Sequence, residues 1–414
     1  MSTISFLHSV AGWRKDHLEG EGPETLHKPG IAVIGDECYV FGGGKTFTCS
    51  STLYCASIFT HKWSTIETSG DIPKARLALG MCGFEDKLWI TCGFDYSTYF
   101  QDTFEFDLTT EKWTQIHSEK HPQARYSFSL LYHNSFMYLF GGVPQFQKRL
   151  NDTWQFNTIK KHWEKIEPFG KLPVGRSSHT AIIHNNSMVI FGGLSSNGSR
   201  VNDLQMLDLT LLTWFEIETK PAISVIPNLQ MSNSESKSKS KSMSMSMLKR
   251  RFKRTQFWNS HSPPLMSGGV AMIYLDRYLV SFGGMSTELG EHNYTFVFDF
   301  ETKEWSNYDK TKRDHLLLEE FLSSQQNTEK KGEISYQINP NLLSELEMKI
   351  EDKWNKVMRP PPSFGHVGFA RNRNELFVFG GFQKENDEIW IFTLENEIVM
   401  DFRLFLESGS LCDF

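Results

Sequence analysis

Residues 124–163, ARYSFSLLYHNSFMYLFGGVPQFQKRLNDTWQFNTIKKHW, contain the pattern on which the whole chain is built. Three short runs rich in apolar residues, 127–132, 136–140 and 152–156, are separated by turn residues, and Trp163 begins a fourth. The second run ends in a pair of glycines. Short aromatic and aliphatic runs bounded by Gly, Asn and Asp are typical of antiparallel strands. The stretch therefore predicts three strands and the start of a fourth.

The same unit recurs with a period near 50 residues. Its tryptophans lie 50, 50 and 51 residues apart, and pairs of glycines keep the same spacing. Two more glycine pairs follow at longer intervals of 91 and 97 residues. Such a period is typical of a β-propeller, and six glycine positions predict six blades. The positions expected to be structural are Trp63, Trp113, Trp163, Trp214 and Trp305, with Gly42, Gly43, Gly93, Gly141, Gly142, Gly192, Gly193, Gly283, Gly284, Gly380 and Gly381.

The repeated unit resembles the kelch repeat, in which the second strand ends in Phe-Gly-Gly and a Trp closes the unit. The matching segments are YVFGG (39–43), YLFGG (138–142), VIFGG (189–193), VSFGG (280–284) and FVFGG (377–381). The second unit departs from this pattern, because Cys92 replaces the first glycine. The resemblance to this family, within the galactose-oxidase-like propellers, implies an all-β, six-bladed kelch-type β-propeller. It implies little about function, because one fold hosts many functions.

The spacing predicts a single propeller over residues 1–414. The last blade lacks a closing Trp, whereas residues 5–18, around Trp13, resemble a fourth strand without a blade. We expect this N-terminal strand to close the ring, since an open ring leaves sheet edges exposed. Residues 398–406 are the alternative closing strand, and either Trp305 or Trp354 can be the fifth-blade Trp. The expected blades cover 28–66, 76–116, 124–166, 175–217, 263–308 and 363–395.

Two inserts interrupt the repeat, each between the last strand of one blade and the first strand of the next. The insert at 219–262 is of low complexity, with nine Lys or Arg residues and one Glu, and is expected to be disordered and basic. The insert at 306–353 is expected to be partly helical, because apolar residues recur on one face of 342–350. The kelch arrangement implies that both rise from the face that carries the loops after the glycine pairs.

The totals point to an intracellular protein. The net charge of −6 gives no general case for nucleic acid or membrane as a partner. The six cysteines have no metal-binding spacing, so reduced thiols are expected. The N-terminus has no basic leader, and no apolar run approaches the ~20 residues of a membrane helix. We expect a monomeric propeller that is cytoplasmic and not secreted. A nuclear location is the alternative.

No signature of an enzyme is present. The chain has no GxSxG, HExxH, Walker A or GxGxxG motif, so no catalytic residue, metal ligand or cofactor is predicted. His179 and His366 occupy one repeat position, and we expect them to be structural. Asp152 and Asp203 each follow an Asn and are expected to form turns.

Three arginines at one repeat position have two interpretations. Arg76, Arg125 and Arg176 each precede the first strand of a blade, so they are expected near the central opening on the insert-bearing face. They can hold neighbouring loops together, or they can bind carboxylates of a partner, which guanidinium groups contact in bidentate fashion. Apolar residues in otherwise polar loops are further candidates for partner contact, or for packing between loops. They are Tyr96, Tyr99, Phe100 and Phe146.

A basic cluster lies inside the first insert. It comprises Lys249, Arg250, Arg251, Lys253 and Arg254 around Phe252. It can be a nuclear-import signal, a contact to phosphate or nucleic acid, or a solvated segment without a function.

We therefore predict a non-enzymatic scaffold or adaptor that binds a protein partner on the insert-bearing loop face. We expect no BTB-like or F-box-like segment before the propeller. One alternative is an enzyme or small-ligand propeller that uses the central channel. A second alternative is a nuclear or nucleic-acid-associated factor that uses the basic insert. The partner and the cellular process are not predicted.

Overall fold

The structure is a computed structural model of the whole chain. It describes residues 12–23, 27–45, 47–221, 263–274, 276–287, 290–309, 360, 366–371, 375–380 and 388–393. Most of both predicted inserts lies outside the described residues, as do residues 398–406, Trp354 and the cluster Lys249–Arg254.

The described strands form six four-stranded antiparallel units, which we call blades 1 to 6. Blade 1 contains β2 (Gly30–Ile34), β3 (Glu37–Phe41), β6 (Leu53–Ser57) and β7 (Lys62–Ile66). Blade 2 contains β9 (Gly80–Phe84), β10 (Lys87–Thr91), β11 (Thr103–Asp107) and β12 (Lys112–Ile116). Blade 3 contains β14 (Ser129–His133), β15 (Phe136–Phe140), β17 (Thr153–Asn157) and β18 (His162–Ile166).

The remaining blades follow the same plan. Blade 4 contains β21 (Thr180–His184), β22 (Ser187–Ser195), β23 (Arg200–Asp208) and β24 (Thr213–Ile217). Blade 5 contains β27 (Val270–Tyr274), β28 (Tyr278–Ser286), β29 (Gly290–Asp299) and β30 (Glu304–Asn307). Blade 6 contains β31 (His366–Arg371), β32 (Glu375–Gly380), β33 (Glu388–Thr393) and β1 (Gly12–His17). Two-residue strands also pair at the blade edges: β4 (Gly44–Lys45), β5 (Thr48–Cys49), β8 (Ser69–Gly70), β13 (Arg125–Tyr126), β16 (Val143–Pro144), β19 (Phe169–Gly170), β20 (Arg176–Ser177), β25 (Lys220–Pro221) and β26 (Met266–Ser267).

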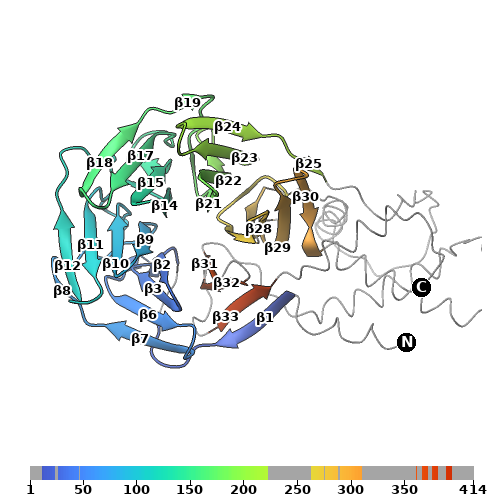
Figure 1. Cartoon of the computed structure of the whole chain (residues 1–414). Coiled ribbons are helices and arrows are strands. Elements are labelled where there is room, and N and C mark those ends of the chain that lie inside the picture. The colour runs from blue at the N-terminus through green and yellow to red at the C-terminus, as the bar shows by residue number, and fades with distance from the viewer. Residues whose placement is uncertain are drawn as a thin grey trace, which may run out of the picture.

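The blades are arranged in a ring around a central opening (Figure 1). The first strands of successive blades are neighbours, from β2 through β9, β14, β21 and β27 to β31, which lies beside β2 again. The predicted all-β propeller is confirmed. In blade 6, β1 pairs with β33 in antiparallel register, with Trp13 opposite Phe392. Strands from the two ends of the described chain thus share one sheet.

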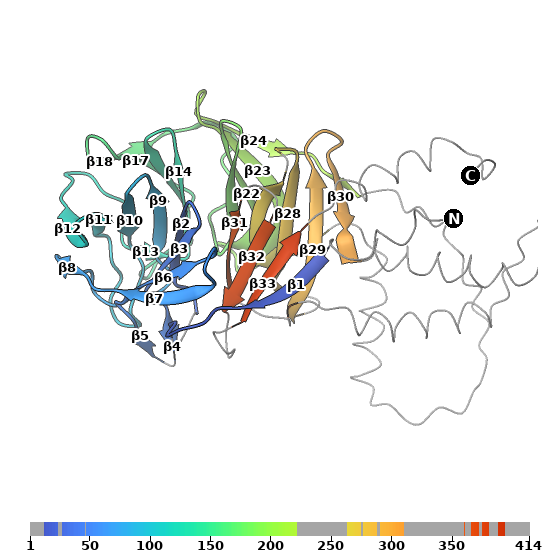
Figure 2. The ribbon, with the colours of Figure 1, turned by 60° about the horizontal axis from the view of Figure 1, so that its bottom comes forward.

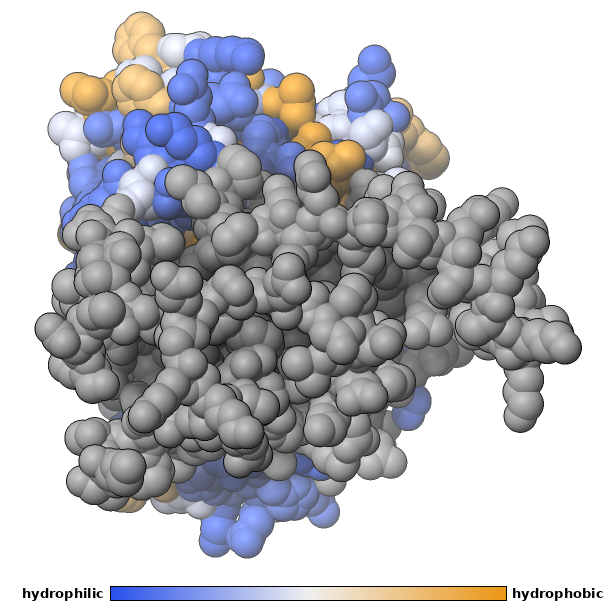
Figure 3. Space-filling view, turned by 90° about the vertical axis from the view of Figure 1, so that its right-hand side faces the viewer, coloured by the Kyte–Doolittle hydropathy of each residue, from blue (hydrophilic) through white to orange (hydrophobic). Residues whose placement is uncertain are grey.

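The alternation of strand directions gives the ring two faces. We call the face with the loops between second and third strands, and with the linkers between blades, the loop face. The opposite face carries the tight turns that join the first strand to the second and the third to the fourth. Figure 2 shows the strands running between these two faces. In Figure 3 the coloured upper part of the side view mixes hydrophilic and hydrophobic residues.

The core lies between neighbouring blades rather than within one. The closing tryptophans are buried, with exposed fractions of 6% or less for Trp63, Trp113, Trp163, Trp214 and Trp305. Trp113 of blade 2 packs on Phe41 of blade 1, with ring centroids 5.3 Å apart. Such contacts repeat around the ring, and burial of large aromatic surfaces of this kind dominates core energetics. Trp305 of β30 pairs with Phe298 of β29, just as Trp113 of β12 pairs with Phe106 of β11.

The glycine pairs are explained by close contact between blades. Gly141 has a φ of +71°, and a Cβ there would lie 2.6 Å from the carbonyl oxygen of Arg176. A side chain is therefore disfavoured both by the left-handed backbone and by the neighbouring chain. Cys92 occupies the equivalent place in blade 2 with a φ of +58° and is fully buried.

A chain of backbone hydrogen bonds links blades 1 to 5 on the loop face. Ala78 donates to the carbonyl of Lys28 at 2.7 Å, and Ser127 donates to Ala78 at 3.0 Å. Ser178 and Gly268 continue the series, each donating to its counterpart in the preceding blade. All five residues have a left-handed backbone, with φ between +50° and +74°. The mouth of the channel therefore has a defined backbone geometry on which loop-face side chains are mounted.

Candidate functional site

The three repeated arginines clamp the loops of the loop face. Arg125 donates to both carboxylate oxygens of Asp152, at 2.6 and 2.8 Å, and to the carbonyl of Gly141 at 3.0 Å. Gly141 begins the loop after the second strand of blade 3, and Asp152 ends it. The guanidinium group therefore joins the two ends of that loop. Charge-assisted, bidentate contacts of this kind are the stronger class of hydrogen bonds.

The same clamp occurs in the neighbouring blades. Arg76 binds Asp102 and the carbonyl of Cys92, while Arg176 binds Asp203 and the carbonyl of Gly192. All three arginines expose 0% of their surface. They have no surface to offer a partner in this arrangement, so of the two interpretations their burial favours the structural one.

The aspartates of the clamps also have a different role from the one that the sequence predicts. Asp152 and Asp203 were expected to form turns, but their carboxylates accept the arginine hydrogen bonds instead. Burial by itself would raise the pKa of the Asp152 carboxyl, yet the hydrogen bonds and charge of Arg125 outweigh it and hold that pKa below its usual value. The same balance, with Arg176, lowers the pKa of Asp203.

The aromatic residues predicted for partner contact differ in how far the fold exposes them. Phe146 is 95% exposed and Tyr96 is 38% exposed, whereas Phe100 is only 7% exposed. Phe100 packs under the clamp, with its ring 4.0 Å from the Arg76 guanidinium carbon. Partner contact through Phe100 is therefore wrong, because its ring is used in a cation–π contact inside the blade. Tyr99 is half-buried on the loop face.

Tyr96 and Tyr99 belong to a larger group of rings that the sequence did not reveal. Phe94 lies 5.4 Å from Tyr96 and 5.6 Å from Tyr99 between ring centroids, and it stacks on Tyr126 at 4.5 Å. Phe47, 80% exposed, packs against Tyr96 from the loop of blade 1. We call Phe47, Phe94, Tyr96, Tyr99 and Tyr126 the aromatic cluster. It spans the loops of blades 1 to 3.

Two further arginines of the loop face differ from the clamp arginines, and one of them, Arg149, lies near Tyr126 of the aromatic cluster. Arg149 donates from Nε to the hydroxyl of Ser177 at 2.9 Å, and Arg200 donates from Nε to the hydroxyl of Ser267 at 3.1 Å. Both are half-buried, and neither forms an ion pair with a carboxylate of the described residues. Both precede the repeated Asn-Asp pair, in RLND and RVND, and this spacing is the signal that could have identified them.

The loop face therefore combines two properties on a clamped scaffold. The aromatic cluster supplies apolar area with polar hydroxyl edges. Arg149 and Arg200 are held by serine hydroxyls, and no carboxylate of the described residues neutralises their charges. Arg149 also lies near the hydroxyl of Tyr126, where burial raises the pKa and the arginine charge partly opposes that rise. Exposed Tyr and Arg side chains are the residue types enriched at protein interfaces.

The titratable residues show no catalytic arrangement in the described part of the chain. His179 is buried, and its Nε2 lies 2.9 Å from the hydroxyl of Ser129. Burial, and then the charge of Arg176, lower the pKa of His179 to about 3, so it is neutral at physiological pH. The side chain of His366 is not described. Among the described residues no three His, Cys, Asp or Glu side chains are grouped as metal ligands, and the five described cysteines are free thiols.

The described residues contain no helix with the length and apolar character required to span a membrane.

Comparison with known proteins gives a match to a family model described as the KLHDC2/KLHL20/DRC7 Kelch-repeats domain. It matches residues 3–142 and 117–231, and together these ranges cover more than half of the chain. Three of the five segments that match the kelch pattern, YVFGG, YLFGG and VIFGG, lie within this region.

Three relatives illustrate the similarity. The chain is 28% identical over 251 residues to host cell factor homolog hcf-1 of Caenorhabditis elegans, covering 54% of this chain and 31% of that protein. It is 31% identical over 211 residues to Kelch domain-containing protein 3 of Bos taurus, covering 48% and 55%. It is 27% identical over 233 residues to N-(sulfonatooxy)prop-2-enimidothioate sulfolyase of Thlaspi arvense, covering 50% and 66%. The chain spans less than two thirds of the length of each.

Proposed function

The chain belongs to the kelch-repeat family, and from this premise we propose that it is a non-enzymatic propeller that binds a segment of another protein on its loop face. The observation that carries the proposal is the aromatic cluster with Arg149 near its Tyr126, mounted on loops that buried arginines clamp. Arg200, in the next blade, adds a second arginine to the same face. A rigid scaffold with variable loops is where binding specificity usually resides. The binding surface is then Tyr96, Tyr99, Phe94, Tyr126 and the two unpaired arginines.

The composition of this surface indicates the kind of partner segment that it binds. Arg149 and Arg200 favour acidic groups, which can contact guanidinium groups in bidentate fashion. The aromatic cluster favours apolar side chains next to those acidic groups. Phe146, at 95% exposure, is a further contact point on the loop of blade 3. The clamp arginines contribute by holding the loops rather than by touching the partner.

The test is affinity capture from cells with cross-linking, using the full chain. The binding variant carries Arg149→Glu, Arg200→Glu and Tyr96→Ala. Its matched control carries Lys62→Glu and Lys112→Glu, which make the same change of charge on exposed outer strands. We expect partners to be lost only from the binding variant, with both variants melting at the wild-type temperature. Retention of every partner by the binding variant would refute this surface.

The enzyme alternative has one observation in its favour, namely the relative named as a sulfolyase. Against it stands the chemistry of the first strands, which line the ring. Ile31 and Val33 of β2 pack against the core between blades 6 and 1, while Ala32 packs between blades 1 and 2. These side chains fill inter-blade space and supply no acid or base to the channel. We infer that interaction, rather than catalysis, is the activity of this propeller, in the cytoplasm and as a monomer.

The second alternative, contact of the basic insert with nucleic acid, has its own test. Deletion of residues 231–255 should leave retention on a polyanion column unchanged if the proposal of a protein partner is right. A clear loss of retention would favour the nucleic-acid alternative, because such contacts depend on Lys and Arg.

A further inference from the structure

The aromatic cluster is an apolar area of the loop face that a partner can reach. Phe47 is 80% exposed and Tyr96 is 38% exposed, while Phe94, Tyr99 and Tyr126 are half-buried. These rings belong to blades 1 to 3, which are neighbours in the ring (Figure 1). Exposed apolar surface that is contiguous in this way marks an interaction site. The chemistry of the rings therefore indicates what kind of segment the site accepts.

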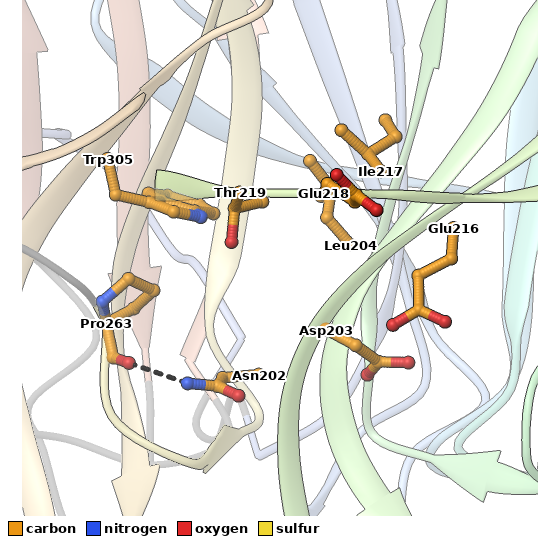
Figure 4. A pocket seen from close by; sticks show the side chains of 9 residues that line it. All are labelled: Asn202, Asp203, Leu204, Glu216, Ile217, Glu218, Thr219, Pro263 and Trp305. Carbon is orange, nitrogen blue, oxygen red and sulfur yellow. Dashed lines mark hydrogen bonds between the residues drawn. The ribbon is translucent and has the colours of Figure 1, made fainter. Parts of the chain in front are cut away.

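The pocket between blades 4 and 5 lacks this property. Figure 4 shows Leu204 and Trp305 among its lining side chains, and these are only 0% and 1% exposed. The carboxylate of Asp203 in the same pocket is already paired with Arg176, at 2.7 Å. Because the apolar side chains of this pocket are covered, it offers little to an apolar ligand, whereas the rings of the aromatic cluster are accessible.

The aromatic cluster also carries hydrogen-bond donors that are not in use. The hydroxyls of Tyr99 and Tyr126 have no hydrogen-bond partner among the residues that the structure describes. The two rings lie 5.6 Å apart between centroids. A tyrosine hydroxyl that becomes buried at an interface usually finds a hydrogen-bond partner. The partner segment must therefore bring hydrogen-bond acceptors close to its apolar groups.

The backbone around the cluster limits the conformation of the partner segment. A β-strand would need free backbone groups at a sheet edge, but Phe94 already exchanges both of its backbone hydrogen bonds with Leu77, at 3.1 and 2.9 Å. Tyr126 is likewise paired with Val143. An α-helix uses its carbonyl groups in its own backbone hydrogen bonds. A polyproline II segment makes no internal hydrogen bonds, so its carbonyl groups remain available to the tyrosine hydroxyls.

The spacing of the rings suits such a segment. Successive ring centroids lie 5.6, 5.4 and 4.5 Å apart along the row of Phe47, Tyr96, Phe94 and Tyr126. A polyproline II helix rises ~3.1 Å per residue, so about five residues are enough to cover the row. The rings of Phe94 and Tyr96 are tilted by 58°, which gives a ridged surface rather than a flat one. At the Tyr126 end the row is followed by Arg149.

We propose that the aromatic cluster binds a proline-rich segment in the polyproline II conformation, with an acidic residue next to the prolines that pairs with Arg149. Proline rings pack on the aromatic rings, and carbonyl groups of the segment accept hydrogen bonds from Tyr99 and Tyr126. Two N–H groups of Arg149 donate to Ser177 and Ser195, at 2.9 and 3.3 Å, and its other N–H groups bind the carboxylate. Aromatic-lined surfaces recognise proline-rich segments in this way, because a preformed conformation loses little entropy on binding. The inference rests on the proposed function and names the segment that the loop face takes.

The test is a fluorescence-anisotropy titration of the full chain with labelled peptides of equal length and charge. The probe is EEPPPPPPEE, with glutamates at both ends so that either orientation places one beside Arg149, and the reference is EEGSGSGSEE. We expect the proline peptide to bind about tenfold more tightly, because its conformation is preformed. Tyr99→Phe with Tyr126→Phe keeps both rings and should weaken binding of the proline peptide about tenfold, as expected for the loss of two hydrogen bonds. Arg149→Gln should weaken binding of EEPPPPPPEE but not of SSPPPPPPSS.

The matched control is Tyr132→Phe on the opposite face, where the hydroxyl accepts a hydrogen bond from the backbone of Ser135 at 3.1 Å. It should bind the proline peptide with wild-type affinity. Equal affinity of the wild type for the proline peptide and the reference would overturn the inference, as would unchanged binding by the variant that lacks both hydroxyls. If the binding variant of the capture experiment still loses its partners, the proposed function stands and only this inference fails. If that variant also retains every partner, both fail.

Discussion

Arg125 and Asp152 form a bidentate ion pair between the two ends of one loop, although the arginine exposes none of its surface. A buried charge is tolerated only when paired and hydrogen-bonded, and this guanidinium group meets both conditions with the carbonyl groups of Gly141 and Gln123. The repeated arginine is thus a structural part of the loop face. Its partner is the aspartate of the Asn-Asp pair some 27 residues later.

Replacing Asp152 by Asn should destabilise the propeller strongly. The substitution leaves the buried Arg125 charge without its counter-ion, and breaking a buried pair from one side costs ~3–5 kcal/mol. The measurement is urea unfolding of the purified chain. Glu167→Gln, a carboxylate that is 79% exposed, is the control and should change the free energy of unfolding by less than ~0.5 kcal/mol. Similar effects of the two variants would show that the clamp contributes little.

His179 should make the stability depend on pH. Its folded-state pKa, about 3, lies below its unfolded value near 6.5, because the site is buried and close to Arg176. Between these values the unfolded chain binds the proton and the folded chain does not. Stability is therefore full above pH ~6.5 and falls as the pH is lowered, by up to ~2 kcal/mol at pH 5. Denaturant midpoints from pH 7.5 to 5 measure this loss.

The comparison for that experiment is a His179→Gln variant, which keeps a polar side chain that can reach Ser129. Its overall stability can be lower, but its midpoints should change less between pH 7.5 and 5 than those of the wild type. Parallel curves for the two proteins would assign the pH dependence to other groups.

Replacing Gly141 by Ala should lower the free energy of unfolding by more than the left-handed backbone conformation alone explains. A Cβ there would lie 2.6 Å from the Arg176 carbonyl, whereas at Gly35 nothing lies within 4 Å. Both glycines have positive φ, at +71° and +60°. Gly35→Ala should therefore show only the left-handed penalty of ~1–2 kcal/mol, and Gly141→Ala clearly more. Chemical denaturation of both variants measures the difference. Equal losses would mean that the blade contact adjusts without cost.

Removal of β1 should open the ring. Deleting residues 1–17 takes away the edge strand paired with β33 and the ring of Trp13, which lies 4.3 Å from Phe282. The deletion exposes a strand edge and apolar surface of blades 5 and 6, so we expect a lower melting temperature and aggregation. Deleting residues 1–11 leaves β1 in place and is the control. A deletion of 1–17 that melts like the control would mean that another segment completes blade 6.

Much of the fold could be predicted from the sequence, because a fold built of repeated blades has a repeated sequence pattern. Trp113, Trp163 and the glycine pairs recur at fixed spacing since each blade meets its neighbour in the same way. Local patterns of this kind require no knowledge of which distant residues touch. They were sufficient for the strands, the propeller and the family.

Which side chains reach the surface was decided by tertiary structure alone. Phe100 and Tyr96 are four residues apart in one loop, yet one ring packs under Arg76 and the other faces solvent. Arg125 and Arg149 are both loop arginines, but within the described part of the chain only the first forms an ion pair with a carboxylate. Exposure and charge pairing depend on contacts between segments far apart in the chain, and those contacts exist only once the blades have packed.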